Sequence, residues 1–310
     1  MKKLTAILLC ILMLFIASSC SRQNARDEDE KNLQEQENFA YIDNNFPITV
    51  RGVVINQLPT KIVSFSPALT EIMGELGLEN HMVGRTPYCE YSDYVENLPV
   101  VGTMLMPDIP LLLQLLPEYI LTQTPLSDEL NQILSDMGTK VVIIEKATDI
   151  DKVTEIYTDL FLMCRGSEYG LESAQAFNKQ FKEDYLDAVM PATLSSQKID
   201  TVYLSRELNP ATPDTFENCI MQDMGLNNLA QGTNWDANQG DINPKLILAA
   251  LESDDAKIKE SSAYSQSDAV KSNNIIKINF DPIERQSPRM VREIKSVVSY
   301  IYADSNYEQK

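Results

Sequence analysis

The feature that most restricts the fold is one long amphipathic segment near the middle of the chain, from Ser167 to Met190. Its apolar residues recur at three- and four-residue steps: Ala174, Phe177, Phe181, Tyr185 and Ala188. This spacing predicts a single long helix. We expect Pro191 to end it, because proline lacks the N–H that a helix interior requires.

Short β-rich runs alternate with amphipathic stretches on both sides of this segment. Before it, strands are expected at 61–65, 118–122 and 140–144, and helices at 67–77, 108–116, 127–138 and 149–164. After it, strands are expected at 200–205 and 275–280, and helices at 215–224 and 288–302. Alternating strands and helices indicate βαβ units and mainly parallel sheets. The prediction is an α/β protein with two lobes joined by one long helix, and a single doubly wound domain is the alternative.

The N-terminus has the features of an export signal. Lys2 and Lys3 precede an apolar run that is too short to span a bilayer, and small residues follow it. Cys20 stands at the cleavage point, as in bacterial lipoproteins, although a membrane anchor or an ordinary signal-peptidase site is the alternative. The stretch 21–38 is polar and charged, which is typical of a disordered tether.

The predicted organisation therefore has five parts. They are a signal peptide (1–19), a lipid-anchored disordered tether (20–45), an N-terminal α/β lobe (46–165), a bridging helix (166–191) and a C-terminal α/β lobe (192–310).

Composition excludes several functions. The net charge of −19 argues against nucleic-acid binding, which needs a basic face. His81 is the single histidine, so His-cluster metal sites and most catalytic triads are excluded, and we predict neither a metal site nor an enzyme. Cys89, Cys164 and Cys219 match no zinc spacing and are expected to be unpaired thiols.

Several motifs, in order along the chain, resemble those of one family. They are KIVSFSPALTE (61–71), TPYCEY (86–91), LPVVG (98–102), LPEYIL (116–121) and ERQSPR (284–289). Together they resemble substrate-binding lipoproteins of ABC importers for corrinoids, haem and ferric siderophores. The resemblance covers about residues 47–303 and implies two lobes bridged by one rigid helix.

Two motifs are similar to those of the vitamin B12-binding subgroup: Tyr88-Cys-Glu-Tyr91 and Asp281-Pro-Ile-Glu-Arg-Gln-Ser-Pro-Arg289. The resemblance implies that Tyr88, Asp281 and Arg285 line a ligand cleft, and Met104 falls where the subgroup has a stacking Trp. Parallel α/β sheets bind ligands at the carboxyl ends of their strands. The predicted ligand-binding residues are Ser66, Tyr88, Met104, Arg206, Trp235, Asp281 and Arg285.

The family also docks its permease through one glutamate on each lobe. The corresponding positions here are Pro110 and Lys245, with Asp108 and Asp241 just before them. We expect these aspartates to replace the docking glutamates, and simple helix capping is the alternative.

The predicted function is therefore an extracytoplasmic solute-binding protein. It would capture a cobalamin-type corrinoid or a related cobalt or iron chelate and deliver it to ABC permease and ATPase subunits. It would be a monomer held at the outer side of the cell membrane by a lipid on Cys20. The alternatives are a ferric-siderophore or haem receptor and, more remotely, an exported hydrolase.

Overall fold

The computed structural model describes residues 45–195, 197–230 and 242–302. The expected signal peptide, the lipidation site at Cys20 and the expected tether as far as residue 44 lie outside the described residues, as do Trp235 and Asp241. Asn45, the last residue of the expected tether, is described and is buried.

The first sheet has four parallel strands in the order β4-β3-β5-β6. Their bounds are β3 Ile62–Ser64, β4 Met82–Arg85, β5 Tyr119–Thr122 and β6 Lys140–Ile143. The connecting helices are α2 Pro67–Glu75, α3 Asp93–Glu96, α4 Ile109–Leu115 and α5 Asp128–Asp136, with a short 3-10 turn, η1, at Glu79–His81. Side chains of β5 alternate between two cores: Tyr119 and Leu121 lie in the cluster that includes α2, and Ile120 lies in the cluster with α4 and α5. Helices therefore cover both faces of the sheet.

The second sheet repeats this arrangement, with parallel strands in the order β10-β9-β7-β8. Its strands are β7 Ile199–Leu204, β8 Leu226–Asn228, β9 Leu246–Ala250 and β10 Ile275–Ile278. Its helices are α8 Phe216–Asp223, α9 Asp255–Glu260, α10 Asp268–Lys271, α11 Asp281–Glu284 and α12 Met290–Tyr302. One face packs in the cluster that includes α8 and α12, and the other in the cluster that includes α9 and α10. The predicted fold class, two α/β lobes of parallel strands with a long helix between them, is confirmed.

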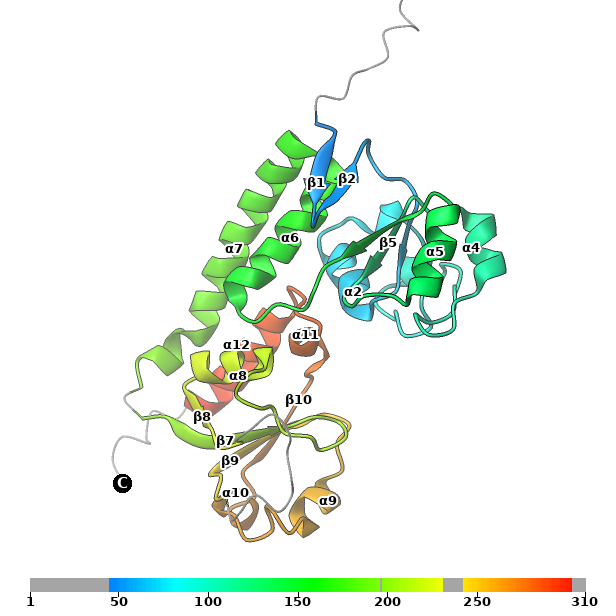
Figure 1. The fold of residues 1–310 in the computed structure, drawn as a ribbon. Helices are drawn as coiled ribbons and strands as arrows, with labels where there is room; N and C mark the ends of the chain where they lie inside the picture. The colour runs from blue at the N-terminus through cyan, green and yellow to red at the C-terminus, as the bar shows by residue number, and fades with distance from the viewer. Residues whose placement is uncertain (1–44, 196, 231–241, 303–310) are drawn as a thin grey trace, which may run out of the picture. The chain divides into compact units, whose positions relative to one another are not determined.

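The long helix is α7, Ser167–Thr193, and it lies beside α6, Ile150–Arg165 (Figure 1). Gly166 makes the turn between them with φ +79°, and a Cβ there would lie 2.4 Å from the Cβ of Asn45. Tyr157 of α6 meets Phe177 and Phe181 of α7 edge to face, at centroid distances of 5.7 and 5.2 Å. These predicted apolar positions therefore hold α7 against α6.

The expectation that Pro191 ends the long helix is wrong, because α7 continues through it to Thr193. Pro191 and Asp187 are both exposed, so the carbonyl that loses its helical partner can be hydrated. Ala188 and Ala192, on the neighbouring face of the helix, remain buried. Packing on that face keeps the last turn helical.

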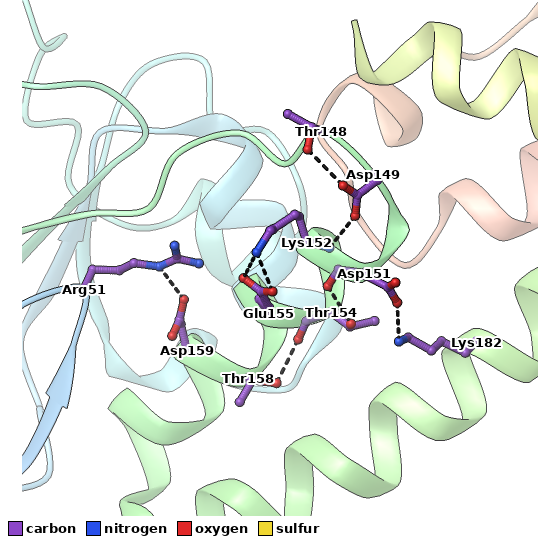
Figure 2. A network of polar contacts seen from close by, with 10 residues as sticks. All are labelled: Arg51, Thr148, Asp149, Asp151, Lys152, Thr154, Glu155, Thr158, Asp159 and Lys182. Carbon is purple, nitrogen blue, oxygen red and sulfur yellow. Dashed lines mark hydrogen bonds and ion pairs between the residues drawn. The ribbon is translucent and has the colours of Figure 1, made fainter. Parts of the chain in front are cut away.

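Polar contacts fix the position of α6 (Figure 2). Asp149 caps its first turn by accepting a hydrogen bond from the backbone N–H of Lys152 at 2.9 Å, and this bond lowers the pKa of the Asp149 carboxyl. Lys182 of α7 pairs with Asp151 at 2.6 Å. Arg51 pairs with Asp159 at 2.6 Å and connects α6 to a small hairpin, β1 Ile48–Val50 and β2 Val53–Ile55, which the sequence analysis did not predict.

Among the helices of the described residues, none combines the length and the apolar character needed to cross a bilayer.

Candidate ligand-binding site

A polar pocket of about 220 Å³ lies where three parallel strands of the second sheet end. Arg206 and Glu207 follow β7, Glu252 follows β9, and Asp281 follows β10. The complete lining is Arg206, Glu207, Ala250, Glu252, Phe280, Asp281, Glu284 and Arg285. The structure thus brings three of the predicted ligand-binding residues together, at the sheet edge where α/β proteins bind ligands.

A larger hollow of about 500 Å³ runs between β10 and α12, but it contains none of the predicted residues. It lies along a strand and a helix rather than at the strand ends. We therefore take the smaller pocket as the candidate site, because its position and its charged side chains both suit specific recognition.

The charged side chains of the pocket form a row of alternating sign. Arg206 lies 3.7 Å from Glu252 and 3.9 Å from Asp281. Asp281 lies 3.6 Å from Arg285, which in turn donates to Glu71 at 2.8 Å. Burial acts to lower the pKa of the Arg285 guanidinium, but its hydrogen bond to Glu71 and the charges of Glu71 and Asp281 outweigh this and raise it. Both pocket arginines are therefore already paired with carboxylates.

Glu71 reaches the pocket arginine from the first lobe. Ser66 caps α2 by accepting from the N–H of Leu69 at 3.2 Å, and Pro67 occupies the first turn. Glu71 lies one turn further along and is fully buried. A buried carboxylate needs partners, and besides Arg285 it has Ser287 at 2.6 Å and Arg289 at 3.3 Å.

The segment after α11 is fixed by Gln286, whose backbone has φ +57°. Its side-chain amide accepts from the N–H of Ala147 at 2.8 Å and donates to the carbonyl of the same residue at 2.7 Å. The backbone carbonyl of Gln286 accepts a hydrogen bond from the hydroxyl of Tyr157 at 2.7 Å. These bonds hold an unfavourable backbone conformation in place and so position Arg285 next to it.

An aromatic pair lies at the pocket, and one of its members, Phe280, belongs to the lining. Tyr203 of β7 packs against Phe280 with ring centroids 3.6 Å apart, and its hydroxyl donates to Glu284. Burial and the neighbouring carboxylate of Glu284 raise the pKa of Tyr203 well above its usual value. The Tyr203 hydroxyl is therefore a fixed donor to Glu284.

In the first lobe, Tyr88 is the most exposed of the predicted contacts described, with 64% of its surface accessible. Its neighbour Cys89 is buried, and the sulfur lies 3.1 Å from the hydroxyl of Thr70 and 3.2 Å from that of Thr86. Because these contacts hold Cys89 in the interior, the ring of the neighbouring Tyr88 lies on the surface after β4. Cys89, Cys164 and Cys219 are free thiols, as predicted.

Met104 lies in a tight turn between β4 and α4. The backbones of Thr103 and Met106 bond to each other in both directions, at 3.1 and 3.2 Å. The Met104 sulfur accepts from the hydroxyl of Thr124 at 3.3 Å, while Leu105 is 85% exposed. Met104 therefore packs partly inward, and Leu105 and Met106 present the apolar surface of this turn.

The other predicted residues have structural partners. Ser66 is buried, and besides capping α2 it donates to Gln123 at 3.0 Å. Asp108 caps α4 by accepting from the N–H of Leu111 at 3.0 Å. His81 contacts the carbonyl of Pro59 at 2.6 Å. No group of three or more metal-ligating side chains occurs in the described part of the chain.

Four carboxylates of this site are not among the predicted ligand-binding residues: Glu71, Glu207, Glu252 and Glu284. Glu207 and Glu284 follow the strands predicted at 200–205 and 275–280, which is a signal that a systematic reading of strand ends could have used. No strand is predicted before Glu252, which follows β9. Glu71 lies inside a helix and has no such signal.

No family model matches the chain. It is 25% identical to the ABC transporter substrate-binding lipoprotein YvrC of Bacillus subtilis, over 98% of this chain and 99% of that protein. It is 21% identical to a cobalamin-binding protein of Halobacterium salinarum, over 80% of this chain and 72% of the other. The haem-binding protein HutB of Vibrio cholerae has a similar fold, with a TM-score of 0.65 and 20% identity, over 78% of this chain and 99% of that one.

The chain shares with these proteins an α/β fold, in which two parallel sheets are joined by a long helix and a pocket lies at strand ends. The resemblance to substrate-binding lipoproteins of ABC importers is confirmed by the match along nearly the whole chain. The relatives are named as binding proteins, and the expectation of a binding protein rather than an enzyme is also confirmed.

Proposed function

We propose that this protein captures a cobalamin-type corrinoid outside the cytoplasm and delivers it to an ABC permease. The class rests on the full-length similarity to a substrate-binding lipoprotein. The choice of a corrinoid as the ligand rests on one observation, the charge balance of the pocket. Two arginines and four carboxylates line it, and each arginine already has a carboxylate partner.

This balance disfavours anionic ligands. Haem carries carboxylates and ferric catecholates are anionic, so either would have to displace Glu71 or Asp281 to use Arg285 and would meet further carboxylates nearby. A corrinoid presents amide groups around its rim. Amides both donate and accept hydrogen bonds, so they can bond to Glu207 or Glu252 and to the arginines without separating an ion pair.

In this proposal the apolar contacts come from the first lobe. The exposed ring of Tyr88 and the turn that carries Met104 would cover the flat face of the macrocycle. Arg206, Asp281 and Arg285 would bond its polar edge, Ser66 would hold the start of α2, and Trp235 would add an aromatic contact.

A spectral titration tests the ligand. The mature protein is mixed with cyanocobalamin, haem and a ferric catecholate chelate, and binding is followed by absorbance and equilibrium dialysis. We expect cyanocobalamin to bind most tightly. Absence of binding to all three would overturn the proposed function.

One observation favours the haem or siderophore alternative. Arg206 is more than half exposed, and its nearest carboxylates lie at 3.7 and 3.9 Å, which is too long for a direct hydrogen bond. It could turn toward an anionic group at small cost. Tighter binding of haem or of the ferric chelate in the same titration would support this alternative.

We also propose that Cys20 carries the lipid that holds the protein at the outer side of the cell membrane, supported by the lipoprotein relative and the leader sequence. Asp108 and Asp241 would meet the permease. Mass spectrometry of the membrane fraction should find a diacylated N-terminal Cys20, and Cys20→Ser should lack that modification. An unmodified wild-type N-terminus would contradict the assignment.

A further inference from the structure

We infer that Glu71, a residue of α2 outside the pocket, determines the ligand preference of the pocket by holding and neutralising Arg285. The inference rests on the proposed function and names a positioning residue for it. The observation behind it is an ion pair that joins distant parts of the chain, with the Arg285 Nη1 and Glu71 Oε2 atoms 2.8 Å apart.

The contacts of Glu71 use both of its oxygens. One accepts from Arg285 and the other from Ser287, with Arg289 at 3.3 Å from that second oxygen. A fully buried carboxylate with these partners cannot turn away without leaving a charge unpaired, which is costly. Glu71 is therefore a fixed anchor for the guanidinium.

Arg285 is the group whose behaviour depends on this anchor. Its side chain is 27% exposed, so part of the guanidinium faces the pocket while another part is bound to Glu71. With Glu71 present, Arg285 offers the ligand a hydrogen-bond donor whose charge is already balanced. Without that carboxylate, the same guanidinium would keep Asp281, at 3.6 Å, as an ion-pair partner, and it would attract anions.

The net charge of the buried cluster allows a controlled experiment. Glu71 with Arg285 and Arg289 sums to +1. Glu71→Gln raises this sum to +2 and can destabilise the fold. The double variant Glu71→Gln/Arg289→Gln keeps the sum at +1 and still frees Arg285 from its carboxylate.

A second buried carboxylate in an ion pair provides the control. Glu217 of α8 is 8% exposed and pairs with Lys146 at 2.6 Å, but neither residue lines the pocket. Glu217→Gln also removes one buried carboxylate from a cation. It should lower the melting temperature without changing which ligand binds better.

The experiment measures the dissociation constants of cyanocobalamin and haem for wild type and for each variant, with melting curves in parallel. We expect Glu71→Gln and the double variant to shift the ratio of the two affinities toward haem by about tenfold, the effect of one charge-assisted hydrogen bond. Glu217→Gln should keep the wild-type ratio. The shift should shrink at high salt.

The remaining outcomes are decisive. An unchanged ratio in folded Glu71 variants, when wild type binds cyanocobalamin, would overturn the inference and leave the proposed function intact. If wild type binds neither probe, the proposed function fails and the inference fails with it. If neither Glu71 variant folds, Arg285→Gln replaces them. It should weaken the binding of cyanocobalamin and of haem by similar factors. A selective loss of haem binding would show that Arg285 is not neutralised in the wild type and would overturn the inference.

Discussion

The exposed ring of Tyr88 gives the most direct test of the binding face. In the proposed function it covers one face of a flat ligand. Because the ring is exposed, little of the protein's own packing depends on it. We consider the substitution Tyr88→Ala. Cys89, which anchors the loop from the inside, stays in place.

The expected magnitude follows from the exposure of the ring. A fully covered aromatic side chain buries about 150–250 Å², so the 64% of Tyr88 that is exposed leaves about 100–160 Å² available. A planar ligand covers about half of this, which at ~25 cal/mol per Å² amounts to about 1–2 kcal/mol. Affinity should fall about fivefold to thirtyfold, while the free energy of unfolding should change by less than about 0.5 kcal/mol because the site is on the surface.

Equilibrium dialysis with cyanocobalamin measures the affinity, and urea unfolding measures the stability. Tyr88→Phe keeps the ring and should bind within about twofold of wild type. Tyr169→Ala is the matched control, because Tyr169 lies on α7 with a similar exposure of 59%. If Tyr88→Ala binds as tightly as Tyr169→Ala, the placement of the ligand against Tyr88 is wrong.

Three further predictions concern single side chains. Ser66→Ala should lower the free energy of unfolding by about 1 kcal/mol, the value of a helix cap, as measured in urea; an unchanged midpoint would contradict the capping role. Asp108→Asn keeps an acceptor for the N–H of Leu111 but loses the charge, so stability should fall by no more than about 0.5 kcal/mol while stimulation of the permease ATPase falls; full stimulation would exclude docking through this carboxylate. Asp149→Asn should be less stable than wild type at pH 6 by about 0.5 kcal/mol, because the charge favours the α6 N-terminus. Since the pKa of Asp149 is lowered in the folded state, that difference should disappear as the pH falls below about 4, and a difference that persists at pH 2 would refute the electrostatic explanation.

Local pattern was sufficient for most of the helices and strands. The apolar spacing of α7 shows which side of the helix is buried, and the continuous β-rich runs of β3, β5 and β7 indicate strands covered on both faces. Both patterns are local properties of the sequence. The cap at Ser66 follows from the same logic, since Ser-Pro before an apolar repeat is a helix start. The end of α7 was not predictable in this way, because packing of Ala188 and Ala192 outweighs the missing hydrogen bond at Pro191.

The candidate site also has features that the sequence predicts and features that depend on tertiary packing. The sequence by itself determined that Arg206 and Asp281 follow strands, and parallel strands bring such residues to one edge. Tertiary structure alone decided that Arg285 pairs with Glu71, 214 positions away, and that β9 lies between β7 and β10. Periodicity shows that a side chain is buried but not which partner it meets, because that depends on how distant segments pack. The sequence therefore assigns Glu71 to a helix and nothing more. Its role becomes clear from the structure, in which Arg285 and Arg289 lie beside it.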